Sequence, residues 1–575
     1  MADQDHETSA AGGGARRRIL ILGGYGTFGG RLARLLADES RLTLLIAGRS
    51  LEKAQAFSAS LPAGAERRAA VFDRSGDVSR QLGELEPDLV VDASGPFQNY
   101  GADPYALVRA CISLKIDYLD LADGADFVAG VASQDAEAKA AGVYALSGVS
   151  SFPVLTAAVV RALAASMTRI DSISAGIAPS PHAGVGLNVI RAIASYAGQP
   201  IRLRRRGVET EAPGLIDSRR YTVRPPGMPP LDNIRFSLVD VPDLRLLPKL
   251  WPDARDVWIG AGPTPAILHR ALSMLAHLVR WRVIPTLEPL APLFHAAINL
   301  LRWGEHRGGM FVEVEGVSAE GKLTRRSWHF LAEGDDGPFI PSMAVEGIVR
   351  AELAGRRPAS GARAAVNELE LSDYDTLFAR RAIRHAFRDE VDPRAPLYRR
   401  MLANAWDALP ATIRAMHEFG ADVAHGLAEI ERGSSFMARV IASLFGFPEA
   451  GDDIPVTVRF ARGSAVEVWT RTFADKSFQS RQSIGVGRHE GLLRERFGPF
   501  IFGLALIVDE GRLRLVPKKW SFLGIPLPRS LTPRGDAYEE ERDGKFRFNV
   551  EIRLPLIGLI VAYRGWLEPE RPTGA

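Results

Sequence analysis

The chain has 575 residues, of which 46% are hydrophobic and 24% are charged, with a formal net charge of +3. This length exceeds one ordinary core, so we expect about three globular domains. The nearly balanced charge gives no reason to infer a nucleic-acid partner, and we interpret the basic run 202–206 as a solvated strand or loop. The single cysteine, Cys111, excludes an intramolecular disulfide framework and a multi-cysteine metal site. We therefore expect no metal and a reducing cytoplasmic location.

The beginning of the chain and its most apolar segment bear on targeting. Residues 1–17 are small, polar and glycine-rich, which predicts a disordered tail rather than a targeting signal. No segment offers about eighteen uninterrupted apolar residues, the length of a membrane helix. The nearest, 283–301, carries Glu288 and prolines at positions 285, 289 and 292. Because each proline removes a backbone donor, we do not expect a straight membrane helix there.

A glycine-rich turn near the N-terminus predicts a nucleotide site. An apolar run, 19–22, precedes Gly24, Gly26 and Gly29, and leucines at helical spacing follow. In the dinucleotide fingerprint the first glycine permits a tight turn, the second lets the backbone approach a pyrophosphate, and the third lets the helix pack on the strand. The unpaired N–H groups at the start of this helix would face the pyrophosphate.

The end of the second predicted strand, 42–47, bears on which nucleotide is bound. An acidic residue normally stands there in NAD enzymes and holds the ribose, whereas this chain has Gly48, Arg49 and Ser50. Arginine can pair with a 2′-phosphate, and no carboxylate repels it, so NADP(H) is preferred and NAD(H) stays open. The alternative is an unliganded turn with a solvated Arg49.

Alternating strand and helix patterns continue to about residue 147 and predict an α/β fold, a Rossmann-type doubly wound parallel sheet. Ligands of such sheets bind at the carboxyl ends of the strands. Asp73 follows the third predicted strand and should lie near the adenine. Ser94, Gly95 and Pro96 follow the fourth and should lie near the nicotinamide.

Several linked motifs resemble the saccharopine dehydrogenase-like NAD(P)-binding proteins. They occur in the same order as in that family and are ILGGYGTFGG, IAGRS, VDASGPFQNYG, CISLKIDYLDLADG, GVYALSGVSSFPVLT and, more thinly, GPFIPSMAVEGIVRAEL at 337–353. The resemblance implies a nucleotide domain interrupted by a second domain that covers the nicotinamide, with substrate between the two.

The same resemblance implies roles for particular residues. Gly24, Gly26, Thr27, Phe28 and Gly29 would cradle the pyrophosphate. The ribose phosphate would be held by Arg49 and Ser50, and the base and nicotinamide would be lined by Asp73, Ser94, Gly95 and Pro96. The family's catalytic residues do not carry over, and lysine metabolism does not follow.

Candidate proton donors come from the residues themselves. Asp120 and Asp123 stand at a strand's carboxyl end, and neighbouring carboxylates can split their pKa values and act as acid and base. Capping of the next helix is the alternative for at least one of them. His182, early in the second domain, is a further candidate, and so is His306; a lone histidine is more often structural.

Composition shifts divide the chain. The expected units are a tail at 1–17, a Rossmann domain at 18–167, an inserted α+β domain at 168–335, a return to the nucleotide domain at 336–379, a linker at 380–395 and a C-terminal α+β domain at 396–570. Within the inserted domain, 266–303 is strongly apolar. A buried helical hairpin explains it; a lid over an apolar substrate or a shallow membrane or lipid contact is the other interpretation, since Trp281 and Trp303 are flanked by arginines.

The C-terminal region alternates apolar and polar residues after two helical segments, which predicts an antiparallel curved sheet with a helix against it. It resembles the uncharacterised domain DUF4166 at LYRRML, RGSSFMARVIASLFGFP, GIPLP and YRGWL. This resemblance brings no activity.

Two functional hypotheses follow. The first is an NADP(H)-dependent oxidoreductase that moves a hydride between nicotinamide and an imine, carbonyl or enoyl group of a small-molecule substrate, an apolar one included. The second is a non-catalytic nucleotide-binding sensor or scaffold whose C-terminal domain binds a lipid or protein partner. A homodimer stays open in both cases, and fold alone does not decide between them.

Overall fold

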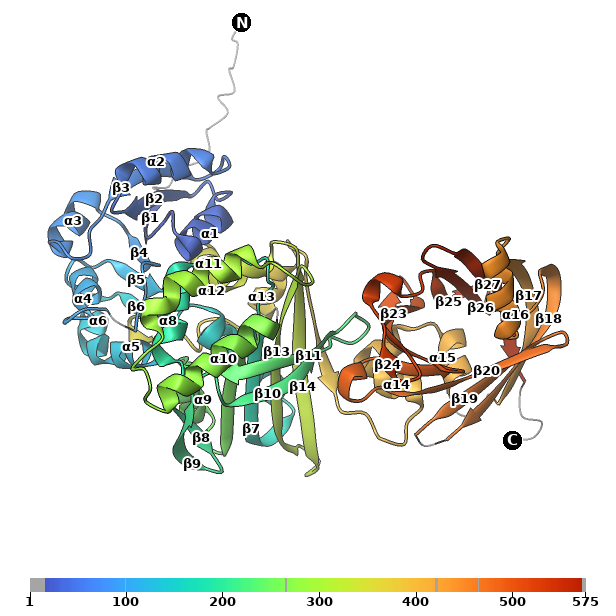
Figure 1. The fold of residues 1–575 in the computed structure, drawn as a ribbon. Coiled ribbons are helices and arrows are strands. Elements are labelled where there is room, and N and C mark those ends of the chain that lie inside the picture. The colour runs from blue at the N-terminus through green and yellow to red at the C-terminus, as the bar shows by residue number, and fades with distance from the viewer. Residues whose placement is uncertain (1–15, 99, 264–265, 419–421, 464, 571–575) are drawn as a thin grey trace, which may run out of the picture.

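The computed structural model describes residues 16–98, 100–263, 266–418, 422–463 and 465–570 (Figure 1). Nearly all of the predicted N-terminal tail lies outside these residues. The described part of the chain contains three large sheets (Figure 1). They are a parallel sheet, a mixed sheet beside it, and an antiparallel sheet that forms a separate lobe.

The first sheet is parallel and has the strand order β3-β2-β1-β4-β5-β6-β15. The first six strands follow the order of dinucleotide-binding folds. The strands are β1 (Arg17–Leu22), β2 (Leu42–Gly48), β3 (Glu66–Val71), β4 (Leu89–Asp92), β5 (Asp117–Asp120), β6 (Tyr144–Ser147) and β15 (Gly361–Ala364). The predicted Rossmann-type sheet is confirmed.

Helices cover both faces of this sheet, so its central strands are continuous apolar runs. Residues 19–22 of β1 and 42–47 of β2 are buried. The helices of this region are α1 (Thr27–Leu36), α2 (Leu51–Ser60), α3 (Val78–Leu85), α4 (Ala106–Ser113), α5 (Ala125–Gly130), α6 (Asp135–Ala141) and α12 (Ile340–Leu353). Helix α7 (Thr156–Ala164) packs on the neighbouring mixed sheet, and α13 (Leu371–Phe378) packs on α7 and α12. The chain returns late to this sheet, because β15 pairs with β6.

The second sheet is mixed, with the order β10-β11-β12-β7-β13-β14-β16. Its strands are β7 (Met167–Ala178), β10 (Ser218–Val223), β11 (Leu231–Leu238), β12 (Asp256–Ala261), β13 (Arg307–Ser318), β14 (Leu323–Glu333) and β16 (Ile383–Asp389). The last strand corrects one expectation: residues 383–389, taken as linker, pair with β14 over seven positions. Their mixed polarity hid the strand, because five of the seven side chains are only half-buried.

The remaining elements of this region lie around the mixed sheet. They are the hairpin β8 (Pro200–Arg205) and β9 (Val208–Pro213), and the helices α8 (Leu187–Tyr196), α9 (Asp243–Leu250), α10 (Ala266–Arg280) and α11 (Ala291–Leu300). The basic run 202–206 falls largely on β8, where Arg204 and Arg205 pair with Glu209 and Asp217. Among the described helices, none combines the length and apolarity needed to cross a bilayer.

The third sheet is antiparallel and closes into a barrel, because β22 pairs with β23. Its strands are β17 (Val423–Arg432), β18 (Gly451–Arg462), β19 (Glu467–Phe473), β20 (Lys476–Ile484), β21 (Leu493–Phe497), β22 (Phe500–Asp509), β23 (Arg512–Phe522), β24 (Ile525–Pro526), β25 (Ala537–Arg542), β26 (Lys545–Leu554) and β27 (Gly558–Pro569). All of them except β24 belong to the ring. The predicted antiparallel curved sheet is confirmed, and its closure goes beyond the prediction.

The ring of strands has one weak seam. Strands β23 and β25 pair only at Leu513 with Glu539 and at Arg514 with Tyr538, whereas β22 pairs with β23 along nearly its whole length. Helices α14 (Leu397–Leu402), α15 (Ala411–His417) and α16 (Phe436–Leu444) pack against the barrel.

The barrel contacts the mixed-sheet region through specific bonds. Lys519 of β23 forms an ion pair with Asp232 of β11. The backbone N–H of Val508 donates to the carbonyl of Gly227 at 2.9 Å, and Arg388 of β16 donates to the carbonyl of Arg400 at 3.2 Å. The barrel is therefore fastened to the mixed-sheet region by backbone and side-chain bonds as well as by the chain itself.

The close packing of α1 against the glycine turn at Gly29 yields a stability prediction. A Cβ there would lie 2.4 Å from the carbonyl oxygen of Gly23, whose backbone cannot yield without distorting the turn. We expect Gly29→Ala to lower the free energy of unfolding by roughly 1–3 kcal/mol, the usual cost of overpacking, and to weaken nucleotide binding. Thermal unfolding and calorimetric titration with NADPH measure the two effects.

The matched control is Gly83→Ala in α3, where an added Cβ has no neighbour within 4 Å. That change should be neutral or stabilising by roughly 0.5–1 kcal/mol, since alanine is the better helix former. Equal behaviour of the two variants would contradict the packing argument.

Candidate nucleotide and substrate site

The glycine turn provides a helix start with free amides. Gly23 turns the chain at a φ of +70°, and the N–H of Gly26 donates to its carbonyl at 2.8 Å. Helix α1 then begins at Thr27, with no acidic residue in its first turn and, within the described part of the chain, no side-chain cap. Its first amides thus remain available to an anion, which the positive end of the helix dipole also favours.

The end of β2 presents an unengaged cation. Arg49 is exposed and, among the described residues, has no hydrogen-bond or ion-pair partner. Ser50 caps α2 by accepting from the N–H of Lys53 at 3.3 Å, and its own N–H donates to the Tyr25 hydroxyl at 3.1 Å. Capping is therefore the observed role of Ser50, and the predicted phosphate contact of Arg49 stays a prediction.

The ends of β3 and β4 form a polar cluster that the sequence analysis missed in part. Buried Asp92 accepts from both the N–H and the hydroxyl of Ser94, at 2.9 and 2.6 Å, and from the Tyr100 hydroxyl. Burial raises the pKa of Asp92. The Arg74 guanidinium lies 3.3 Å from the Tyr100 ring centroid. Asp92 ends its strand, and that position is the signal from which it could have been found.

Asp73 has a local role in the structure. Its side-chain oxygen accepts from the N–H of Ser75 at 2.9 Å, and its backbone N–H donates to Gln81 at 2.8 Å. The residue is exposed at the end of β3, next to the strand end that carries Arg49.

A loop of the mixed-sheet region lies against the glycine turn. Arg31 of α1 donates to the carbonyl of Ala183 at 2.8 Å, and a Cβ on Gly186 would lie 2.6 Å from the Thr27 hydroxyl. Asn188, at the start of α8, donates to the carbonyl of Gly95 at 2.6 Å. The segment before and at the start of α8 thus contacts both the pyrophosphate turn and the loop expected to face the nicotinamide.

The two predicted carboxylates occupy different surroundings. Asp120 is fully buried, and one of its oxygens accepts from Ala122 N–H, Ser147 hydroxyl and Gly148 N–H at 2.8–3.0 Å. Burial raises its pKa to about 7 against these bonds. Its partners fasten β5 to the loop after β6, and its predicted catalytic role stays a prediction.

Asp123 lies where two regions of the chain meet. Burial raises its pKa, a hydrogen bond from Gln98 opposes the shift, and nearby Asp240 raises it further. Burial also raises the pKa of Asp240, which follows β11. Desolvation, and then the charges of both carboxylates, raise the pKa of Tyr196 of α8. The sequence analysis did not anticipate Asp240 or Tyr196, because their closeness to Asp123 depends on how the mixed sheet packs on the first domain.

The two candidate histidines are brought together. The rings of His182 and His306 lie 4.4 Å apart at an interplanar angle of 50°. The backbone N–H of His182 donates to the Ser180 hydroxyl at 3.2 Å, and His306 Nε2 lies 3.2 Å from an Asp335 oxygen. The pair lies beside the loop that contacts α1, so His182 keeps its place as a candidate.

Two segments of the chain match known domain families. Residues 19–146 match the saccharopine dehydrogenase NADP binding domain, and residues 409–567 match the domain of unknown function DUF4166. The two resemblances predicted from the motifs are thereby confirmed. The N-terminal domain is of the NAD(P)-dependent oxidoreductase class. No curated protein sequence matches the chain.

Solved structures show only distant likeness. Apo saccharopine dehydrogenase (L-Glu forming) from Saccharomyces cerevisiae is 13% identical, with 65% of this chain and 100% of that one covered, at a TM-score of 0.46. The WlbA dehydrogenase from Thermus thermophilus, in complex with NAD and alpha-ketoglutarate, is 10% identical, with 60% of this chain and 90% of that one covered, at a TM-score of 0.30. A probable dehydrogenase from Thermotoga maritima is 11% identical, with 60% of this chain and 91% of that one covered, at a TM-score of 0.30.

The buried carboxyl of Asp120 predicts a pH dependence. Folded Asp120 keeps its proton up to about pH 7, whereas an unfolded aspartate releases it near about pH 4. Folding therefore takes up a proton between these values, and this contribution to stability is lost as pH rises through about 7. Asp120→Asn removes it, so the stability of the wild type relative to the variant should fall as pH rises, measured by urea unfolding from acid to mildly basic pH.

Asp243→Asn is the control, because burial also raises the pKa of Asp243 to about 7. That variant keeps the contribution of Asp120 and loses its own, so the double variant should have the flattest pH profile. A constant difference between wild type and Asp120→Asn would contradict the assignment.

Proposed function

We propose that this protein is an NADP(H)-dependent oxidoreductase acting on an imine, carbonyl or enoyl group of a small-molecule substrate. The observation that carries the proposal is Arg49, an exposed guanidinium with no partner among the described residues, at the end of β2 in a domain that matches an NADP-binding family. The nucleotide would supply the hydride chemistry. The start of α1, which has no side-chain cap among the described residues, suits the pyrophosphate of the nucleotide. The end of β2 carries Arg49 where NAD enzymes have an acidic residue that holds the ribose.

The proton that accompanies the hydride is assigned to Asp123. Its raised pKa keeps it protonated at higher pH than an ordinary aspartate, so it can donate a proton to a developing amine, alkoxide or enolate. Asp240 supports the protonated form by like-charge repulsion. His182, whose ring lies beside that of His306 near the glycine turn, is the second candidate.

A reducing cytoplasmic location and contact with a membrane surface are further parts of the proposal. Residues 266–303 carry four arginines against the single acidic Glu288. Their exposed apolar side chains are Ile267, Met274, Trp281, Val283, Leu290, Leu293, Leu300 and Trp303. Indole rings and arginines beside exposed apolar groups are typical of helices that lie in an anionic membrane interface.

Arg49→Ala tests nucleotide selection. Loss of a charge-assisted pair with the 2′-phosphate costs about 1.5–3 kcal/mol, so the affinity for NADPH should fall by about tenfold or more. The affinity for NADH, which lacks this phosphate, should not change. Calorimetric titration with each nucleotide provides the measurement.

Arg80→Ala on the exposed face of α3 is the control, since Arg80 pairs only with neighbouring Glu84 among the described residues. Equal losses of NADPH and NADH affinity in Arg49→Ala would refute the role in selection. Consumption of NADPH with imine, keto or enoyl substrates then separates an oxidoreductase from a nucleotide-binding sensor or scaffold, because the latter binds without turnover.

The membrane contact has its own test. The wild type should co-sediment with vesicles of phosphatidylcholine and phosphatidylserine more than with phosphatidylcholine alone, and added salt should weaken binding. Replacing Trp281 and Trp303 by serine should remove most of it, whereas Val208→Ser, on an exposed hairpin residue elsewhere, should leave it intact. Binding that is indifferent to the tryptophans would rule out this surface.

A further inference from the structure

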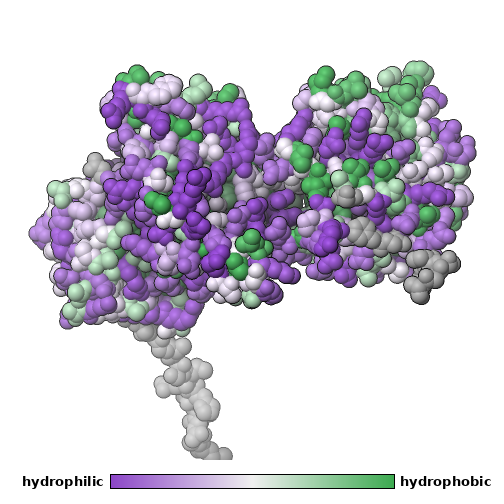
Figure 2. Space-filling view, turned by 90° about the horizontal axis from the view of Figure 1, so that it is seen from below, coloured by the Kyte–Doolittle hydropathy of each residue, from purple (hydrophilic) through white to green (hydrophobic). Residues whose placement is uncertain are grey.

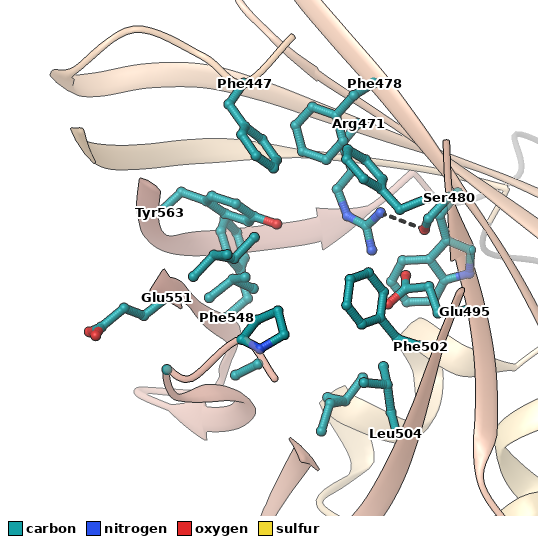
Figure 3. Close-up of a pocket in the computed structure, with 18 of the residues that line it drawn as sticks. Phe447, Arg471, Phe478, Ser480, Glu495, Phe502, Leu504, Phe548, Glu551 and Tyr563 are labelled. Atoms are coloured by element: carbon teal, nitrogen blue, oxygen red, sulfur yellow. Dashed lines mark hydrogen bonds between the residues drawn. The ribbon is translucent and has the colours of Figure 1, made fainter. Parts of the chain in front are cut away.

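A large cavity lies inside the C-terminal barrel, away from the nucleotide edge. Its volume is about 680 Å³, within the range of small-molecule sites. A ring of this many strands is wider than the eight-stranded barrels whose interiors hold one small ligand, so side chains alone do not fill it. Alternation along the strands sends aromatic side chains inward (Figure 3).

The cavity wall is dominated by aromatic and aliphatic groups. Its aromatic members include Trp469, Phe478, Phe502, Phe522 and Tyr563. Such a lining favours the burial of an apolar ligand.

Most polar groups in the cavity are engaged with one another. The Tyr398 hydroxyl donates to Gln482 Oε1 at 3.1 Å, and Gln482 Nε2 donates to Glu495 Oε1 at 3.0 Å. The Glu539 carboxylate lies 2.6 Å from His417 Nε2. Two arginines also belong to the cavity wall: Arg534 is exposed, and Arg471 is half-buried.

Of these two arginines, Arg471 lies on β19. Its guanidinium points into the cavity and donates to the Ser480 hydroxyl at 3.0 Å (Figure 3). It lies 5.0 Å from the Trp469 ring centroid and 6.0 Å from that of Phe478. Within the described residues no carboxylate reaches ion-pair distance of it, Glu495 included. A guanidinium carries several N–H donors in a planar fork that matches a carboxylate.

The cavity has a mouth at one end. Leu444 of α16 and Phe522 of β23 belong to its wall and are nevertheless 78% and 40% exposed. Further exposed apolar residues, Phe436, Met437 and Val440, lie on the same helix, and apolar groups are dense on the surface of this lobe (Figure 2). A ligand can enter there with its apolar body in contact with protein throughout.

We propose that the barrel binds a single-chain amphipathic carboxylate, with the carboxylate on Arg471 and the acyl chain among the aromatic side chains. This binding site is separate from the proposed reductase chemistry and does not depend on it. The cavity volume suits one chain rather than a two-chain lipid.

The test uses the full chain and the fluorescent fatty acid cis-parinaric acid, displaced by oleate or by oleyl alcohol. The wild type should bind the probe and prefer oleate over oleyl alcohol. Arg471→Gln should weaken oleate at least about tenfold, the loss of one charge-assisted interaction, and leave oleyl alcohol unchanged. Arg459→Gln, on the exposed side of β18, should alter neither.

A cavity-filling variant and the ligand preference of the wild type complete the test. Ala537→Trp, which places an indole inside the cavity wall, should abolish binding of both ligands while NADPH affinity is retained. Should Arg471→Gln fail to fold, the preference of the wild type still decides. Equal affinity for oleate and oleyl alcohol, or unaltered binding in Ala537→Trp, would overturn the proposal.

Discussion

The close approach of α1 to the turn before it is the constraint on which the first two regions depend. Only a residue without a Cβ fits at Gly29, because the Gly23 carbonyl oxygen occupies that space. This contact sets the direction of α1. Arg31 and Ser342 then attach the loop at 183–184 and helix α12 to it. The glycine turn thus positions the predicted pyrophosphate site and also the elements that would enclose the substrate.

The sequence predicted the parts of the fold that are governed by local periodicity. The strand-turn-helix at 17–36 and its continuation to β6 follow from apolar runs separated by helical patterns. Strand β16 was missed because its side chains alternate too weakly. Closure of the barrel could not be foreseen, since the pairing of β22 with β23 and of β17 with β27 depends on curvature accumulated over the whole sheet.

The candidate site divides along the same line. Arg49 and the glycines are adjacent in sequence, and their chemistry is readable from their order. Asp123, Asp240 and Tyr196 come from separate elements, and only packing of the mixed sheet on the first domain brings their charges together. Arg471 illustrates the limit most clearly: in sequence it is one of many strand arginines, and only the closed barrel makes it an interior cation.

The short pairing between β23 and β25 has a consequence for the motions of the barrel. Opening a strand pair costs the hydrogen bonds and packing it holds, and this pair holds far fewer than its neighbours. Local opening should therefore have its lowest free energy at this seam, well below that of global unfolding. The barrel can then open between β23 and β25 while its other strand pairs stay intact. Ligand exchange and thermal stability are therefore set by different parts of the same sheet.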